Sequence, residues 1–293
     1  MKPELAFKYE SDVGEGPIWD PVSQELIWID VTRGLIHRFN PKGGEITTLP
    51  IGQHIGAVGL FSKTHYIAAV RDGFAKINSN TGEVEYLHHV LHSPEIRFND
   101  GKCDPRGRFV AGTMRYEPEI GTAALYSCAP DGIVTEILSG VGLSNGLCWN
   151  KTGDTFFYID TLTRSIARFD YDLDSGKLSN KSIFFQFDEN DGSPDGMAID
   201  SEESIWVALW GGSKIVKIDR NGSQVAQIEL PVSQPTSLTF GGGDLRTLYV
   251  TSARFQLKAE QLAKEPLAGS IFSIQVEIPG RAEPVFEVGR LSN

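Results

Sequence analysis

The feature that most constrains the fold is an internal repeat of about 40–50 residues. Each copy begins with an oxygen-bearing side chain, ends in Asp or Asn, and precedes a turn and a β-patterned run. Four copies align without a gap: Glu15-Gly-Pro-Ile-Trp-Asp20, Asn99-Asp-Gly-Lys-Cys-Asp104, Asn145-Gly-Leu-Cys-Trp-Asn150 and Asp195-Gly-Met-Ala-Ile-Asp200. Two weaker copies begin at Ile55 and Thr236, so successive first residues are 40, 44, 46, 50 and 41 residues apart.

This period, with about four strands in each unit, is typical of propeller blades. We therefore predict an all-β protein: a six-bladed β-propeller with four-stranded antiparallel blades around a central channel, as one domain over residues 1–293. Leu5–Tyr9 is expected to add the outer strand of blade 6, and Gln256–Lys264 to form a short helix. The expected strands of blade 1 are Gly16–Asp20, Glu25–Asp30, Leu35–Asn40 and Glu45–Pro50.

Composition restricts the partners and the compartment. The formal net charge of −11 argues against a nucleic-acid partner, since phosphate binding needs a basic surface. No apolar run approaches the ~18 residues of a membrane helix, and Met1–Glu10 lacks the pattern of a signal peptide. The three cysteines are an odd count without paired spacing, which favours free thiols in the cytoplasm. The oligomeric state is left open.

The repeat also predicts a site on the channel axis. Equivalent positions of different blades are related by rotation about that axis, so Glu15, Asn99, Asn145 and Asp195 are expected to converge at one end of it. Two carboxylates in a narrow channel repel each other unless a positive charge lies between them. Glu15 and Asp195 supply −2, which matches a divalent cation, and Asn145 adds a neutral oxygen. Asn99 is a further candidate oxygen donor, and whether it contacts the metal or only a substrate is left open.

The predicted donors are all oxygens, which suits hard ions such as Ca²⁺, Mg²⁺ or Mn²⁺. No His or Cys occupies an equivalent position, which disfavours a structural zinc site, although the metal identity stays open among Ca, Mg, Mn and Zn. Ile55 and Thr236 leave coordination positions free, as expected of a catalytic ion. Such an ion polarises an ester carbonyl and lowers the pKa of water, while a carboxylate takes the proton.

Several motifs resemble the regucalcin / senescence marker protein / gluconolactonase family, and in particular its bacterial sugar-lactonase branch. The resemblance runs from about Gly14 to Val276 and implies a six-bladed propeller with one divalent metal that hydrolyses a small sugar lactone. The motifs that carry it are Gly14-Glu-Gly-Pro-Ile-Trp19, Arg97-Phe-Asn-Asp-Gly-Lys102, Ala111-Gly-Thr-Met114, Ser144-Asn-Gly-Leu147, Pro194-Asp-Gly-Met197, Ala208-Leu-Trp-Gly-Gly212 and Leu248-Tyr-Val-Thr-Ser-Ala253.

The resemblance also implies roles for individual residues. The family's metal ligands correspond to Glu15, Asn145 and Asp195. Its substrate contacts correspond to Arg97, Asn99 and Glu117. Asp195 would also be the general base. The family often carries paired acids in the loop that contains Glu117, whereas here the neighbouring residue is Tyr116.

Three alternatives remain at this point. Arg97 is as compatible with a surface or inter-blade salt bridge as with substrate binding. The same metal site would serve another ester or phosphoester hydrolase. A non-catalytic calcium- or ligand-binding propeller is a different class again, because propellers host many functions.

Overall fold

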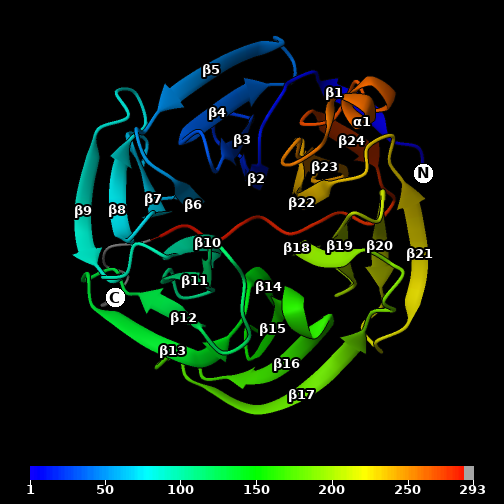
Figure 1. Cartoon of the computed structure of the whole chain (residues 1–293). Helices are drawn as coiled ribbons and strands as arrows, with labels where there is room; N and C mark the ends of the chain where they lie inside the picture. Colours follow the sequence, from blue (N-terminus) through cyan, green and yellow to red (C-terminus); the bar gives the residue numbers. More distant parts are fainter. Residues whose placement is uncertain (287–293) are drawn as a thin grey trace.

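Six four-stranded antiparallel sheets form a ring in the computed structural model of the chain, which describes residues 1–286 (Figure 1). The innermost strand of every sheet comes first in its repeat and the outermost strand lies on the rim. The predicted six-bladed β-propeller is therefore confirmed. No helix in the described part of the chain is long and apolar enough to cross a membrane.

Blades 1 to 3 follow the chain from the innermost strand outward. Blade 1 consists of β2 (Gly14–Asp20), β3 (Glu25–Asp30), β4 (Leu35–Asn40) and β5 (Glu45–Pro50). Blade 2 consists of β6 (Ile55–Leu60), β7 (His65–Val70), β8 (Gly73–Asn78) and β9 (Val84–His89). Blade 3 consists of β10 (Ile96–Cys103), β11 (Phe109–Arg115), β12 (Ala123–Cys128) and β13 (Val134–Val141).

Blades 4 and 5 have the same order, and blade 6 joins the two ends of the chain. Blade 4 consists of β14 (Ser144–Trp149), β15 (Thr155–Asp160), β16 (Ser165–Tyr171) and β17 (Leu178–Gln186), with the 3₁₀ turn η1 (Thr161–Thr163) after β15. Blade 5 consists of β18 (Ser193–Ile199), β19 (Ile205–Trp210), β20 (Lys214–Ile218) and β21 (Gln224–Glu229). Blade 6 consists of β22 (Pro235–Gly241), β23 (Thr247–Ser252), β24 (Ile271–Gln275) and β1 (Glu4–Phe7).

The N-terminal strand closes the ring. β1 pairs antiparallel with β24 and forms the outer strand of blade 6, which confirms the role predicted for Leu5–Tyr9. The predicted helix is shorter than expected: α1 spans Ala259–Lys264, between β23 and β24. Gln256 has a φ of 59°, which a right-handed helix does not allow, so the helix starts after it.

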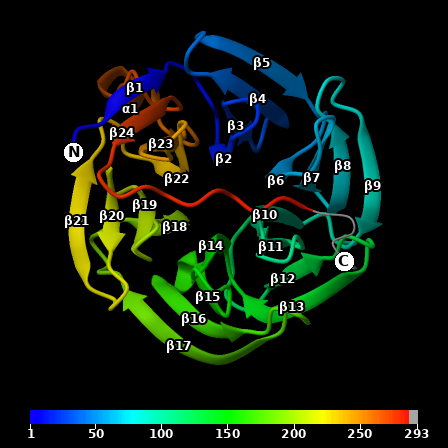
Figure 2. The same ribbon diagram turned by 180° about the vertical axis from the view of Figure 1, so that it is seen from behind.

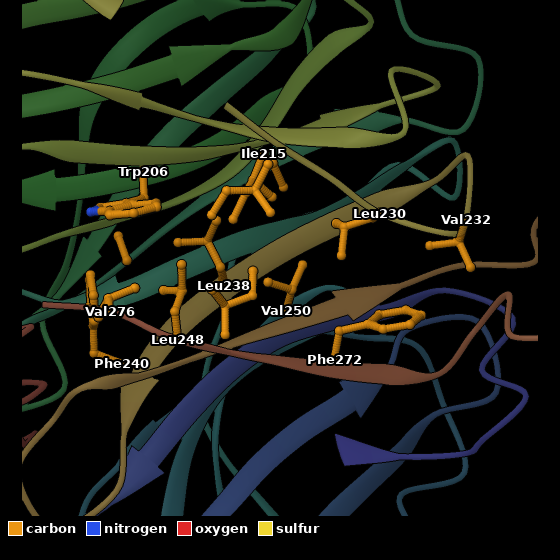
Figure 3. Packing of buried hydrophobic residues seen from close by; sticks show 14 of the residues in the cluster. Trp206, Ile215, Leu230, Val232, Leu238, Phe240, Leu248, Val250, Phe272 and Val276 are labelled. Carbon is orange, nitrogen blue, oxygen red and sulfur yellow. The ribbon is translucent and has the colours of Figure 1, made fainter. Parts of the chain in front are cut away.

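Inner strands are buried on both faces because neighbouring blades pack sheet against sheet. Blades 5 and 6 show this in Figure 3, where Trp206 and Ile215 of one sheet face Leu238, Val250 and Phe272 of the other. Burial on both faces explains why many inner strands are continuously apolar instead of alternating. The outer strands, with one face to solvent, carry the exposed polar residues.

A one-residue bulge near the start of the innermost strands sets the geometry of the channel. The register shifts between Phe98 and Gly101 in blade 3, and at the matching places of blades 4, 5 and 6. Ile55 of blade 2 and Phe98 of blade 3 are the last paired residues before the bulge. The residue of blade 2 that corresponds to Asn99 is therefore Gly56 and not Ile55. A side chain on Gly56 would collide with the backbone of Phe98 and Asn99, so only glycine fits there.

The segment from residue 277 to residue 286 crosses the middle of the ring in both views (Figures 1 and 2). Its Glu283 pairs with Lys102 at 3.1 Å between Oε1 and Nζ, and the Phe286 N–H donates to the Leu60 carbonyl at 2.7 Å. Lys102 and Leu60 lie toward the ends of their innermost strands. This segment therefore covers the end of the channel opposite to the strand starts.

Candidate metal and substrate site

The four oxygen-bearing residues of the repeat lie near the starts of four innermost strands. Glu15 is on β2, Asn99 on β10, Asn145 on β14 and Asp195 on β18. Asn99 Nδ2 donates to Asn145 Oδ1 at 2.9 Å although 46 residues separate them. Glu15, Asn145 and Asp195 are only 5–7% exposed. The side chains thus stand at one end of the channel, as the rotation of the blades predicts.

The two carboxylates of this group are buried and form no ion pair with any described residue. Glu15 Oε2 accepts a hydrogen bond from the Gly16 N–H at 2.7 Å, but neither Glu15 nor Asp195 forms an ion pair within residues 1–286. Burial and the charge of Asp100 raise the pKa of Glu15 to about 8. Burial, followed by the charges of Glu15 and Asp100, raises the pKa of Asp195 well above its usual range. The charge of Arg97 acts in the opposite direction on Glu15 but is the weakest of these influences, so it does not neutralise the two carboxylates.

A hard divalent cation fits this donor set. Two buried carboxylates and one amide oxygen are the ligand types that such ions take in proteins. No group of three His, Cys, Asp or Glu residues in the described chain is arranged to hold a metal, so an ion here would need the Asn145 oxygen besides the carboxylates. The bulge glycine Gly56 brings no side chain to the axis, and Thr236 bonds the Gly14 carbonyl and Thr251 instead. Blades 2 and 6 therefore add no side-chain donor to this set.

Arg97 extends the group toward the mouth of the site. Its Nη1 donates to Asn99 Oδ1 at 2.8 Å and to the Phe98 carbonyl at 2.9 Å. It is 9% exposed and makes no ion pair with any described residue, so the salt bridge that the sequence left open is not formed. Burial lowers the pKa of Arg97 to about 10, so the guanidinium stays charged at neutral pH. A buried cation without a carboxylate partner is available to bind an anionic or oxygen-rich group.

The loop between β11 and β12 brings Tyr116, rather than Glu117, against Arg97. The Arg97 Cζ lies 5.8 Å from the centroid of the Tyr116 ring. The Tyr116 hydroxyl is 2.9 Å from Nδ1 of His54, which precedes β6. Glu117 is exposed on the same loop and forms no hydrogen bond or ion pair with the other five predicted site residues in the described chain. Its role in substrate binding stays a prediction.

Two residues of the site were missed at the sequence level. Asp100 is 8% exposed, and its charge raises the pKa of both Glu15 and Asp195. An acid beside Asn99 was the available signal, but the repeat pointed only to the first position of the motif. Thr161 bonds Asn145, at 2.7 Å between Oγ1 and Nδ2, and nothing in the motif pointed to a residue of the next turn.

Comparison with known proteins gives a consistent result along the chain. Residues 13–254 match the family model described as SMP-30/Gluconolactonase/LRE-like region. A candidate sugar lactone lactonase of Bacillus subtilis, YvrE, is 38% identical over 92% of this chain and 92% of its own length. Regucalcin of Danio rerio is 36% identical over 94% of each chain.

A solved structure agrees with these relatives. The crystal structure of regucalcin from Agrobacterium tumefaciens, described as a calcium-binding protein, superposes with a TM-score of 0.93. It is 28% identical and the match covers 97% of both chains. The similarity therefore extends over nearly the whole chain.

Proposed function

Because the chain belongs to the SMP-30/gluconolactonase/LRE-like family, we propose that it hydrolyses sugar-acid lactones with the help of one divalent cation held by Glu15, Asn145 and Asp195. The observation that supports this most is the pair of buried carboxylates at the axis, neither of which forms an ion pair with a described residue. The sugar lactone lactonase assignment of a relative 38% identical supports the substrate class.

The residues of the site can divide the reaction between them. A bound cation would supply a Lewis acid for the lactone carbonyl. Asp195 takes a proton from the attacking water, whose oxygen bonds to the carbonyl carbon, and returns it to the ring oxygen when the C–O bond breaks. Asp195 is buried beside the other predicted ligands, which would place its carboxylate next to a water that the cation activates. Arg97 and Asn99 hold the sugar hydroxyls and the developing negative charge at the mouth.

The substrate class is tested by acid release from a panel of aldonolactones, measured as a pH drop. We expect hydrolysis that stops with EDTA and returns when Ca²⁺, Mg²⁺, Mn²⁺ or Zn²⁺ is added back, because the carboxylates need a cation to be ionised side by side. Open-chain sugar esters and phosphoesters serve as controls for a broader hydrolase.

Cation binding by calorimetry without hydrolysis of any lactone would identify a non-catalytic calcium-binding propeller instead. Hydrolysis that is insensitive to EDTA would contradict the metal-dependent mechanism. Both results are read on the same purified protein.

Arg97→Lys separates substrate binding from cation binding. The lysine keeps the charge but loses the planar fork that donates to Asn99 and to substrate oxygens. We expect KM to rise by about 10-fold or more, in line with the loss of a charge-assisted hydrogen bond, while the cation Kd stays unchanged. The matched control is Arg106→Lys, because Arg106 is exposed on the opposite side of blade 3. An unchanged KM would remove Arg97 from the substrate site.

A further inference from the structure

The turn after β15 contributes a residue to the site that neither the repeat nor the family motifs include. We propose that Thr161 is a positioning residue that aims the Asn145 amide, so that its oxygen and not its nitrogen faces the channel axis. The inference rests on the metal site proposed above, in which the Asn145 oxygen is a ligand. Thr161 would act through Asn145 and not touch the cation or the substrate.

The hydrogen bonds of the Thr161 hydroxyl set the direction of the amide. Thr161 Oγ1 lies 2.7 Å from the Pro194 carbonyl oxygen, which can only accept, so the single hydroxyl proton goes there. The same Oγ1 lies 2.7 Å from the Asn145 amide and has only lone pairs left for it. It therefore accepts from Nδ2. The other end of the amide, Oδ1, must point away from Thr161.

The opposite end of the amide is consistent with this direction. Asn99 Nδ2 donates to Asn145 Oδ1 at 2.9 Å and to the Ser144 carbonyl at 2.7 Å. Asn145 Oδ1 thus lies on the side of the neighbouring innermost strand, with the axial group. If the Asn145 amide were reversed, its NH2 group would face the NH2 group of Asn99, and its oxygen would face the lone pairs of the Thr161 hydroxyl. Both hydrogen bonds would then be lost.

Thr161 is itself held in place by the backbone of the strand that carries Asn145. Its N–H donates to the Leu143 carbonyl at 3.0 Å. The preceding Asp160 carboxylate accepts from the Gly142 and Leu143 N–H groups at 2.9 and 3.0 Å and from Leu162 at 3.3 Å. The hydroxyl also links to Pro194, the residue before Asp195. One side chain therefore ties together two of the predicted ligands from two blades.

Blade 1 shows that this position does not need a hydroxyl for the fold. The equivalent residue is Val31, which follows Asp30 and donates its N–H to the Val13 carbonyl at 2.9 Å. The Asp30 carboxylate accepts from Asp12 and Val13, just as the Asp160 carboxylate accepts from residues 142 and 143. Valine is thus compatible with the turn, and the threonine of blade 4 serves the site.

The test compares Thr161→Val, which keeps the shape and removes the hydroxyl, with Thr161→Ser, which keeps the hydroxyl and removes the methyl group. Calorimetric titration of the metal-free proteins with Ca²⁺ and with Mn²⁺ measures the Kd. We expect Thr161→Val to raise the Kd by about 10–100-fold, the usual effect of losing a group that orients a metal ligand. Thr161→Ser is expected to bind like the wild type.

A purely structural role would give a different pattern. The metal-free Thr161→Val protein is expected to melt only about 2–4 °C below the wild type, so its weaker binding is measured on folded protein. If it does not fold, Thr161→Ala provides the same comparison without either γ-methyl group of valine. Wild-type affinity in the hydroxyl-free variant, or equal loss in Thr161→Ser, would overturn the proposal. A wild-type protein that binds neither ion would overturn the proposed metal site itself.

Discussion

Asp195→Asn is expected to abolish measurable cation binding and to lower kcat/KM for a sugar lactone by about 10³-fold or more. The substitution removes one of the two charges that match the cation and also removes the proton acceptor, whose contribution alone is about 10²–10⁴-fold. Asparagine has nearly the same shape, so packing around β18 is kept. The fold is therefore expected to survive, and the loss to be specific for the site.

The measurement combines calorimetry with Ca²⁺ and Mn²⁺, initial rates on the best lactone, and the melting temperature. Asp174→Asn is the matched control, because the Asp174 side chain is 90% exposed and lies on the opposite side of the molecule. It is expected to leave all three values at the level of the wild type. Full activity of Asp195→Asn would exclude Asp195 as the base, and an unchanged cation Kd would show that its charge is not needed to hold the ion.

Glu15→Gln is expected to have opposite effects on binding and on stability. Cation binding should be lost, because Asp195 is then the only carboxylate among the proposed ligands. The metal-free variant should nevertheless be more stable than the metal-free wild type at pH 8 and above. The reason is that burial and the charge of Asp100 disfavour the ionised form of Glu15 and raise its pKa to about 8.

The direction in which the free energy of unfolding changes with pH follows from the difference in the pKa of Glu15 between the folded and the unfolded chain. The unfolded chain releases the Glu15 proton at about pH 4.3, whereas the folded metal-free protein retains it up to about pH 8. The folded state binds the proton more tightly, so the free energy of unfolding is highest below the unfolded pKa. It falls as the pH rises through this window, because the unfolded chain loses the proton first. Glutamine carries no charge at any pH and removes this loss.

Thermal unfolding at pH 4.5 and at pH 8.5, with EDTA and with saturating Ca²⁺, measures these effects. In EDTA the two proteins should melt alike at pH 4.5, and Glu15→Gln should melt higher at pH 8.5. Calcium should raise the melting temperature of the wild type only. A variant less stable than the wild type at pH 8.5 without metal would show that the ionised Glu15 has a compensating partner within the protein.

The repeat is sufficient to locate much of the site. Its spacing predicts the number of blades, and the rotation that relates the blades brings Glu15, Asn99, Asn145 and Asp195 together. This works because the first residue of each copy has the same local environment in every blade. The one error of alignment, Ile55 for Gly56, arose in a weak copy, which has no oxygen-bearing side chain at the first position to mark the alignment.

Contacts between blades and between distant segments were not predictable in this way. Thr161 reaches Asn145 and the Pro194 carbonyl only because the turn after β15 folds back onto the start of β14. Glu283 reaches Lys102 from 181 residues away because the last segment crosses the channel. Neither contact repeats from blade to blade, so no periodic signal marks it.

Arg97 is a further residue whose role the sequence left open and the tertiary structure narrowed. An arginine suits a salt bridge and a substrate contact equally well. The structure favours the substrate contact, because Arg97 is buried beside Asn99 and forms no ion pair with a described residue. The sequence by itself thus determined the six-bladed ring and the convergence of its oxygen-bearing residues, since both follow from a repeated local pattern. The tertiary structure decided which neighbours orient, charge and enclose that group, because those contacts depend on how the blades and the chain ends meet in space.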